Sequence, residues 1–159
     1  MSLWVVVVVQ WLHIAAGVTW IGSAIGLDVV MWPQLLRMQP GAARELHDRV
    51  IRVVTPVAGA AGALTIVLGI VRGTVLGPIA SFQFLFGQPY GITWLVALAL
   101  AVVVVVEGVL WERRVEGGLV WVGEELHPGA ARRVFLQCTA ELGAFAVILI
   151  CMVLMAFGL

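Results

Sequence analysis

Charged side chains are scarce in this sequence. Asp, Glu, Lys and Arg make up 11% of its 159 residues, whereas 62% are hydrophobic and the mean hydropathy is +1.10. A soluble domain has roughly a quarter of its residues charged, which lets it cover a surface that faces water. The composition therefore argues against an ordinary soluble domain and predicts a protein that lies in a lipid bilayer.

Lysine is absent, and the nine basic residues, all arginines, are balanced by nine acidic ones. A net charge of zero argues against nucleic acid as a partner, because phosphate binding needs an excess of basic residues. Cys138 and Cys151 lie together in the last apolar stretch, so we predict reduced core residues and no disulfide framework. The sequence has no pattern typical of a hydrolase triad, a phosphate-binding loop or a cysteine-rich metal site.

Long apolar runs take the place of the missing charges. A helix needs about 20 mostly apolar residues to cross a bilayer, and four stretches provide them, at residues 3–30, 50–72, 92–111 and 134–157. No basic segment precedes the first run, which predicts a retained span and not a signal peptide. Glycines and prolines between residues 73 and 91 predict an interfacial loop. We therefore predict an all-α polytopic membrane protein, with residues 1–159 forming a single domain that is a four-transmembrane-helix bundle.

Arginines are unevenly distributed among the predicted connections. The first and third connections contain four arginines each, and the second contains only Arg72. Positively charged connections stay in the cytoplasm, so the first and third connections are predicted to face the cytoplasm and both termini to face the outer side of the membrane. Pro40 and Pro128 each begin a Pro-Gly-Ala-Ala-Arg segment. Because proline suits a first helical turn, both segments predict a helix start ahead of the following span.

Acidic residues occur toward the cytoplasmic ends of three spans, at Asp28, Glu107 and Glu141. Ionisable groups inside a membrane are costly and are usually paired. We expect these carboxylates to form structural ion pairs with arginines from the adjoining connections, namely Arg52, Arg113 or Arg133. A proton route from the cytoplasm to a cofactor is the alternative.

His13 is the only histidine deep inside a predicted span. It follows Leu3 by ten residues, which at 1.5 Å per residue places it roughly 15 Å from the outer surface, near the bilayer midplane. Gln10, Gly17 and Trp20 share its helical face, so a recess of small side chains, closed by an indole, adjoins the imidazole. Such a residue is a functional candidate, either as a ligand of haem or another metal or as a neutral tie between helices.

The segment around His13 resembles the first helix of a group of bacterial membrane proteins. The residues that carry the resemblance are Trp11-Leu-His-Ile-Ala-Ala-Gly-Val-Thr-Trp-Ile-Gly, with His13, Trp20 and Gly22 at the shared positions. The group includes copper-resistance D-like proteins, membrane protoporphyrinogen oxidases of the HemJ type and the membrane domain of cytochrome-linked urate oxidases. In its haem-binding members this histidine is an axial ligand, which implies the same role for His13. HemJ-type oxidases also use an intramembrane lysine, which this chain lacks.

Three functions follow as predictions. The first is a b-type haem protein in electron transfer or redox chemistry, with a haem-dependent oxidoreductase that acts with a redox partner or a quinone-like molecule as one form of it. His13 would be its axial ligand, and Arg72 would bind a haem propionate, unless that arginine only reaches to the interface. The second is a copper-handling or transport protein that uses His13 and methionines. The third is a structural or assembly subunit without a cofactor.

The remaining histidines and the glycine pairs lead to predictions about surface position and helix packing. His47 and His127 lie in charged connections and are predicted to be surface residues. The pairs Gly22–Gly26 and Gly69–Gly73 have the GxxxG spacing of close helix contacts, within one bundle or between two chains. A homodimer, in which a second chain offers a second His13, is a further prediction.

Overall fold

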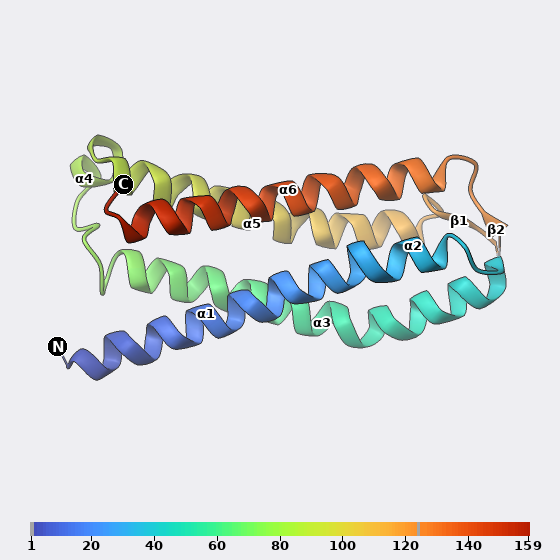
Figure 1. The fold of residues 1–159 in the computed structure, drawn as a ribbon, viewed down its shortest axis with the longest axis horizontal. Coiled ribbons are helices and arrows are strands. Elements are labelled where there is room, and N and C mark those ends of the chain that lie inside the picture. The colour runs from blue at the N-terminus through green and yellow to red at the C-terminus, as the bar shows by residue number, and fades with distance from the viewer. Residues whose placement is uncertain (1, 124) are drawn as a thin grey trace.

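Four long helices run side by side and alternate in direction along the part of the chain that the structure describes, residues 2–123 and 125–159 (Figure 1). The structure is a computed structural model, and these helices are α1 (Leu3–Ile25), α3 (Pro40–Gly73), α5 (Pro89–Glu116) and α6 (Ala130–Ala156). Each is long and apolar enough to cross a membrane. The predicted all-α bundle of four membrane-spanning helices is therefore confirmed.

Both termini lie at one end of the bundle (Figure 1). Helix α1 packs along α3 and α5 packs along α6, while contacts of α3 with α5 and of α1 with α6 complete the bundle. At the end with the termini, the loop after α3 contains only the short helix α4 (Phe82–Gly87), so this stretch forms no fifth spanning helix, as predicted. At the other end, β1 (Trp121–Val122) and β2 (Glu125–Leu126) form a small antiparallel hairpin.

Helices α3, α5 and α6 extend beyond the predicted spans at the end opposite the termini. Helix α3 has 34 residues, roughly 50 Å at 1.5 Å per residue, compared with about 30 Å of bilayer hydrocarbon. It begins at Pro40, as predicted, and continues without a break into the second span. The Pro128 segment also starts a helix ahead of the fourth span, but Gly129 adopts a left-handed conformation with φ 84°, so α6 begins at Ala130 and not at the proline.

The first span ends in a widened turn that has a local cause. The π-helical segment η1 (Gly26–Met31) joins α1 to the short helix α2 (Trp32–Leu35). Pro33 in α2 has no N–H, and its ring would collide with a carbonyl four residues earlier in a regular α-helix. The widened turn relieves that collision, and Asp28 within it is buried.

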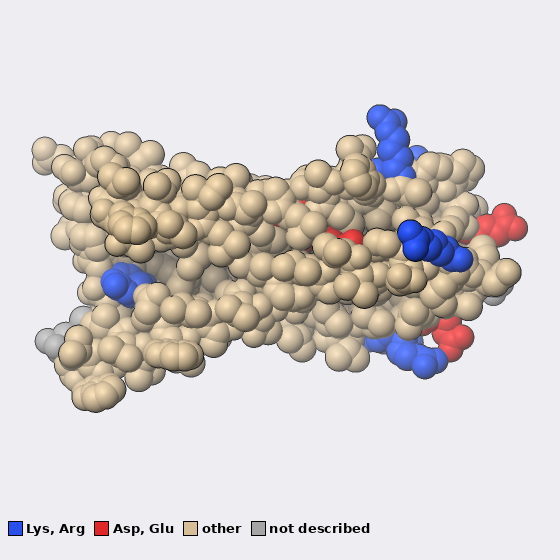
Figure 2. Space-filling model, in the orientation of Figure 1, with Lys and Arg blue, Asp and Glu red and all other residues tan. Residues whose placement is uncertain are grey.

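The sides of the bundle are apolar. Figure 2 shows basic side chains mainly near the end opposite the termini, and a largely uncharged band that covers the middle of this face. Many large hydrophobic side chains of the long helices are exposed, among them Trp11, Val18, Val103 and Ile150. Exposed apolar surface of this kind suits contact with lipid chains, so the protein is a multi-pass membrane protein.

His47 is not a surface residue, and that prediction is wrong. Only 4% of His47 is exposed, because α3 starts early enough to include it and two tryptophans cover its ring. The ring centroids of Trp32 and Trp121 lie 5.2 and 6.2 Å from that of His47. The prediction failed because the first charged connection folds into the start of α3, and the hairpin of the third connection packs against it.

The predicted ion pairs are also wrong in detail. Glu107 pairs with Arg114, at 3.2 Å, and not with Arg113. Among the described residues, neither Asp28 nor Glu141 forms a salt bridge. The arginines expected to meet them instead donate to backbone carbonyls, Arg52 to that of Asp48 and Arg133 to that of Leu119.

Candidate functional site

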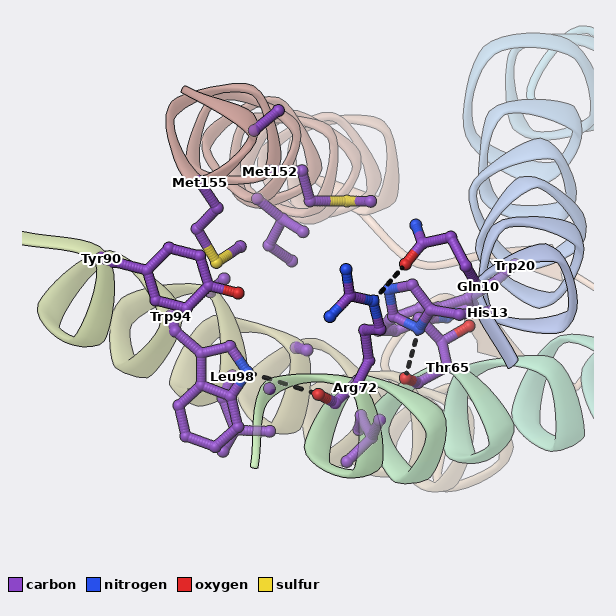
Figure 3. A pocket seen from close by; sticks show the side chains of 17 residues that line it. Gln10, His13, Trp20, Thr65, Arg72, Tyr90, Trp94, Leu98, Met152 and Met155 are labelled. Atoms are coloured by element: carbon purple, nitrogen blue, oxygen red, sulfur yellow. Dashed lines mark hydrogen bonds between the residues drawn. The ribbon is translucent and has the colours of Figure 1, made fainter. Parts of the chain in front are cut away.

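A cavity of about 280 Å³ lies between the four long helices, in the half of the bundle that carries the termini (Figure 3). It is partly open and mainly apolar, with a few polar groups. Each of the four helices contributes to its walls. Its walls include Gln10, His13 and Trp20 of α1, Thr65, Gly69, Arg72 and Gly73 of α3, Tyr90 and Trp94 of α5, and Met152 and Met155 of α6.

The hydrogen bond of His13 determines which of its ring nitrogens carries a proton. Nδ1 lies 3.0 Å from the backbone carbonyl oxygen of Thr65, and a carbonyl only accepts, so Nδ1 is the donor. The lone pair of a neutral ring is then on Nε2, which makes no hydrogen bond among the described residues. A backbone carbonyl that fixes the tautomer in this way also orients metal-binding histidines.

Gly69 provides the recess beside the imidazole. A Cβ atom at this position would lie only 3.1 Å from Cε1 of His13, tighter than ordinary van der Waals contact. The glycine therefore lets the ring lie close to α3 and leaves space on the cavity side. Small residues allow close helix approach in membranes, and here the approach places His13 against the carbonyl of Thr65.

Arg72 carries a positive charge into the same cavity. Its Nε donates to Oε1 of Gln10 at 3.0 Å, and its Nη1 approaches the carbonyl oxygen of Leu76 at 3.4 Å. Both partners are neutral, and Arg72 forms no salt bridge within the described part of the chain. A guanidinium held in this way retains donors for a carboxylate or another anion, which it binds in a fixed, forked geometry.

Aromatic and thioether groups form the walls farther from α1. Trp94 donates its Nε1–H to the carbonyl oxygen of Gly69 at 3.3 Å, and a Cβ at Gly73 would overlap its indole. Met152 and Met155 enter from α6, and Figure 3 shows their side chains across the cavity from Arg72. The cavity thus combines an imidazole and two thioethers, which are possible metal ligands, with a cation and apolar surfaces.

Trp20 closes the cavity toward the middle of the bundle. Its indole lies over Gly62, where a Cβ would come within 3.0 Å of Trp20 Cε2. The ring of Phe145 meets it edge to face, with 5.0 Å between the centroids and an interplanar angle of 82°. Trp20 also lines a second cavity on the other side of the bundle's middle, so its indole separates the two.

Four of the five residues predicted from the sequence line one cavity: Gln10, His13, Trp20 and Arg72. Gly17 does not line it, because it faces α3, where a Cβ would lie 3.8 Å from Cγ2 of Thr65. The sequence reasoning missed Thr65, Tyr90 and Trp94. Gly69, which also lines the cavity, was predicted only as a residue of close helix packing.

Comparisons with protein-family models, with curated proteins and with solved structures return no match for this chain. Its function is therefore inferred from the chemistry of the cavity.

Proposed function

We propose that the protein is a b-type haem-binding protein of the bacterial inner membrane that acts in electron transfer or redox chemistry. The observation that carries this proposal is the state of His13, whose Nδ1–H is held by the carbonyl of Thr65 while the Nε2 lone pair remains available. His13 would be the axial ligand, and Arg72 would bind a propionate. The bound haem would supply one-electron redox chemistry in an apolar site.

The cavity matches such a ligand in chemistry. Small-molecule sites range from about 300 to 1,000 Å³ and are mostly apolar, with a few polar groups. The cavity is partly open and, at about 280 Å³, lies just below that range, so a macrocycle would extend through the opening. Met152 is a candidate for a sixth ligand, since methionine with histidine is a known axial pair. All these residues belong to one chain, so the proposal does not require the predicted homodimer.

Copper handling is a second candidate, which one observation favours. Met152, Met155 and His13 line a single cavity, and thioethers with an imidazole suit Cu(I). Within the described residues no group of three His, Cys, Asp or Glu side chains could hold a metal ion, so copper would depend on the two methionines. Replacing both by leucine would abolish copper binding, but it would leave a five-coordinate haem attached to His13.

The absorption spectrum of the purified protein tests the haem proposal directly. After expression with ample haem precursor, we expect a Soret band and roughly one haem per chain in a pyridine haemochrome assay. Protein that carries no haem under these conditions, and takes up none when haem is added in detergent, would overturn the proposal. Copper content measured on the same samples would then decide whether the second candidate replaces it.

The proposed orientation predicts which end of the bundle is accessible from outside the cell. A cysteine replacing Gln83, exposed in α4, should react in intact cells with a thiol probe that cannot cross membranes. A cysteine replacing Ala42, exposed at the arginine-rich end, should react only after the cells are opened. The native Cys138 and Cys151 are buried and give a low background. Reversed labelling would contradict the distribution of arginines as a guide to orientation.

A further inference from the structure

A second cavity, of about 120 Å³, lies beyond Trp20 in the half of the bundle nearer the arginine-rich end. Three carboxyl side chains line it, and each comes from a different element: Asp28 from η1, Glu112 from α5 and Glu141 from α6. No arginine or lysine is among the lining residues. We call this space, defined by the three carboxyl residues, the acidic cavity.

Asp28 is the carboxyl residue of the acidic cavity that is both buried and without a hydrogen-bond partner at one oxygen. It is only 9% exposed, and its Oδ2 has no hydrogen-bond partner among the described residues. An unpaired carboxylate in such a place is strongly unfavourable, since burial removes its hydration and no countercharge replaces it. Because Asp28 borders an open space, a positively charged occupant there can remove the penalty.

The occupant is best identified as a proton. Within the described residues, no three of the His, Cys, Asp and Glu side chains are grouped closely enough to hold a metal ion. Arg52 and Arg133, the expected counter-ions, are bonded to backbone carbonyls elsewhere. Protons need no coordination shell, and a carboxyl group that takes one becomes a neutral donor and acceptor.

Asp48 and His47 lie in α3 between the arginine-rich end and the part of α3 that lines the acidic cavity. Asp48, whose side chain is 54% exposed, lies 3.2 Å from Nδ1 of His47. The other ring nitrogen, Nε2, is buried and without a partner among the described residues. Trp32 packs on the His47 ring and also lines the cavity. An imidazole with one nitrogen at an exposed carboxylate and the other buried without a partner suits a proton shuttle.

We propose that the acidic cavity is a proton-storage site in which Asp28 and Glu141 hold exchangeable protons, loaded from the arginine-rich side through Asp48 and His47. A proton passes from water to a carboxylate oxygen of Asp48, then to a ring nitrogen of His47 and then to a carboxylate oxygen in the cavity, and no electrons move. The titratable side chains that line the cavity are Asp28 of η1, Glu112 of α5 and Glu141 of α6. Cys138 of α6 lies beside Asp28, and His47 of α3 packs on Trp32, which lines the cavity. The proposal is independent of haem binding.

Infrared spectroscopy of the protein in vesicles tests the storage site, because a protonated carboxyl has a carbonyl stretch that a carboxylate lacks. We expect the full-length protein at neutral pH to show this band, and the band to shift in D₂O. Asp28→Asn and Glu141→Gln should each remove a large part of it, and the double variant nearly all of it. Glu107→Gln is the matched control, since Glu107 is partly exposed and paired with Arg114, and it should leave the band unchanged.

Three results would overturn the storage site: no band at neutral pH, a band that survives in the double variant, or a band that Na⁺ or K⁺ abolishes at constant pH. The last result would mean that the cavity binds a metal cation. The route is tested by the rate of the D₂O shift. His47→Phe keeps an aromatic ring against the tryptophans but should slow the shift by about 10-fold or more, since a positioned acid–base group speeds proton transfer at least that much. An unchanged rate would refute entry through His47.

Discussion

Replacing His13 by alanine is expected to abolish haem retention while the protein still inserts into the membrane. The proposed iron ligand is lost, and outer-shell partners alone change metal affinity about 10- to 100-fold, so we expect more than about 100-fold weaker haem binding. Insertion should persist because the substitution makes the first span more apolar. The measurement is a haem titration of purified protein, with the absorption spectrum and the membrane-bound yield recorded for the same preparations.

His127→Ala is the appropriate control for this substitution. His127 lies at the arginine-rich end, opposite the half of the bundle that contains the cavity. Its Nδ1 donates to the carbonyl oxygen of Pro128. We expect haem affinity and spectrum to be unchanged. His47→Ala is a poor control, because His47 is buried between two tryptophans. If His13→Ala protein retains haem with an unaltered spectrum, His13 is not the ligand.

The spans and the placement of His13 in one of them could be predicted because they depend on local properties of the chain. The length of an apolar run and the period of a helix determine where α1 passes through the bilayer and which residues share a face with His13. Gln10 and Trp20 therefore appear in the cavity as predicted. Arg72 was found because a single arginine at the end of a span is conspicuous in a sequence so poor in charge.

The opposite wall of the cavity could not be predicted, because it depends on how helices meet across long stretches of sequence. No local sequence pattern indicates that the carbonyl oxygen of Thr65 accepts a hydrogen bond from His13, which lies 52 residues earlier. The error for His47 has a similar origin, since the tryptophans that bury it come from elements before and after α3. Glycine spacing was informative only in part. Gly69 and Gly73 do contact neighbouring helices, whereas a Cβ at Gly22 or Gly26 would meet nothing within 4 Å.

Filling the recess at Gly69 should weaken haem binding nearly as much as loss of the ligand. A single Cβ there already comes within 3.1 Å of His13 Cε1, so the leucine of Gly69→Leu would push the imidazole away from Thr65 and occupy the space beside Nε2. We expect at least about 10-fold weaker haem binding, by analogy with the loss of an outer-shell partner, together with a changed spectrum of any haem that remains. Gly69→Ala should have a smaller effect, because the ring needs to move by only a few tenths of an ångström.

Gly22→Leu is the matched control, since it makes the same chemical change on α1 at a glycine with open space around it. Its side chain would face lipid, where leucine is favourable, so haem affinity and spectrum should match those of the unmodified protein. A helix tie without a cofactor predicts that Gly69→Leu lowers thermal stability and that no variant has a haem spectrum to change. Haem bound at this site predicts a spectral change that follows the position of the leucine. Equal haem binding by the Gly69→Leu and Gly22→Leu proteins would show that the recess beside His13 is not where haem lies.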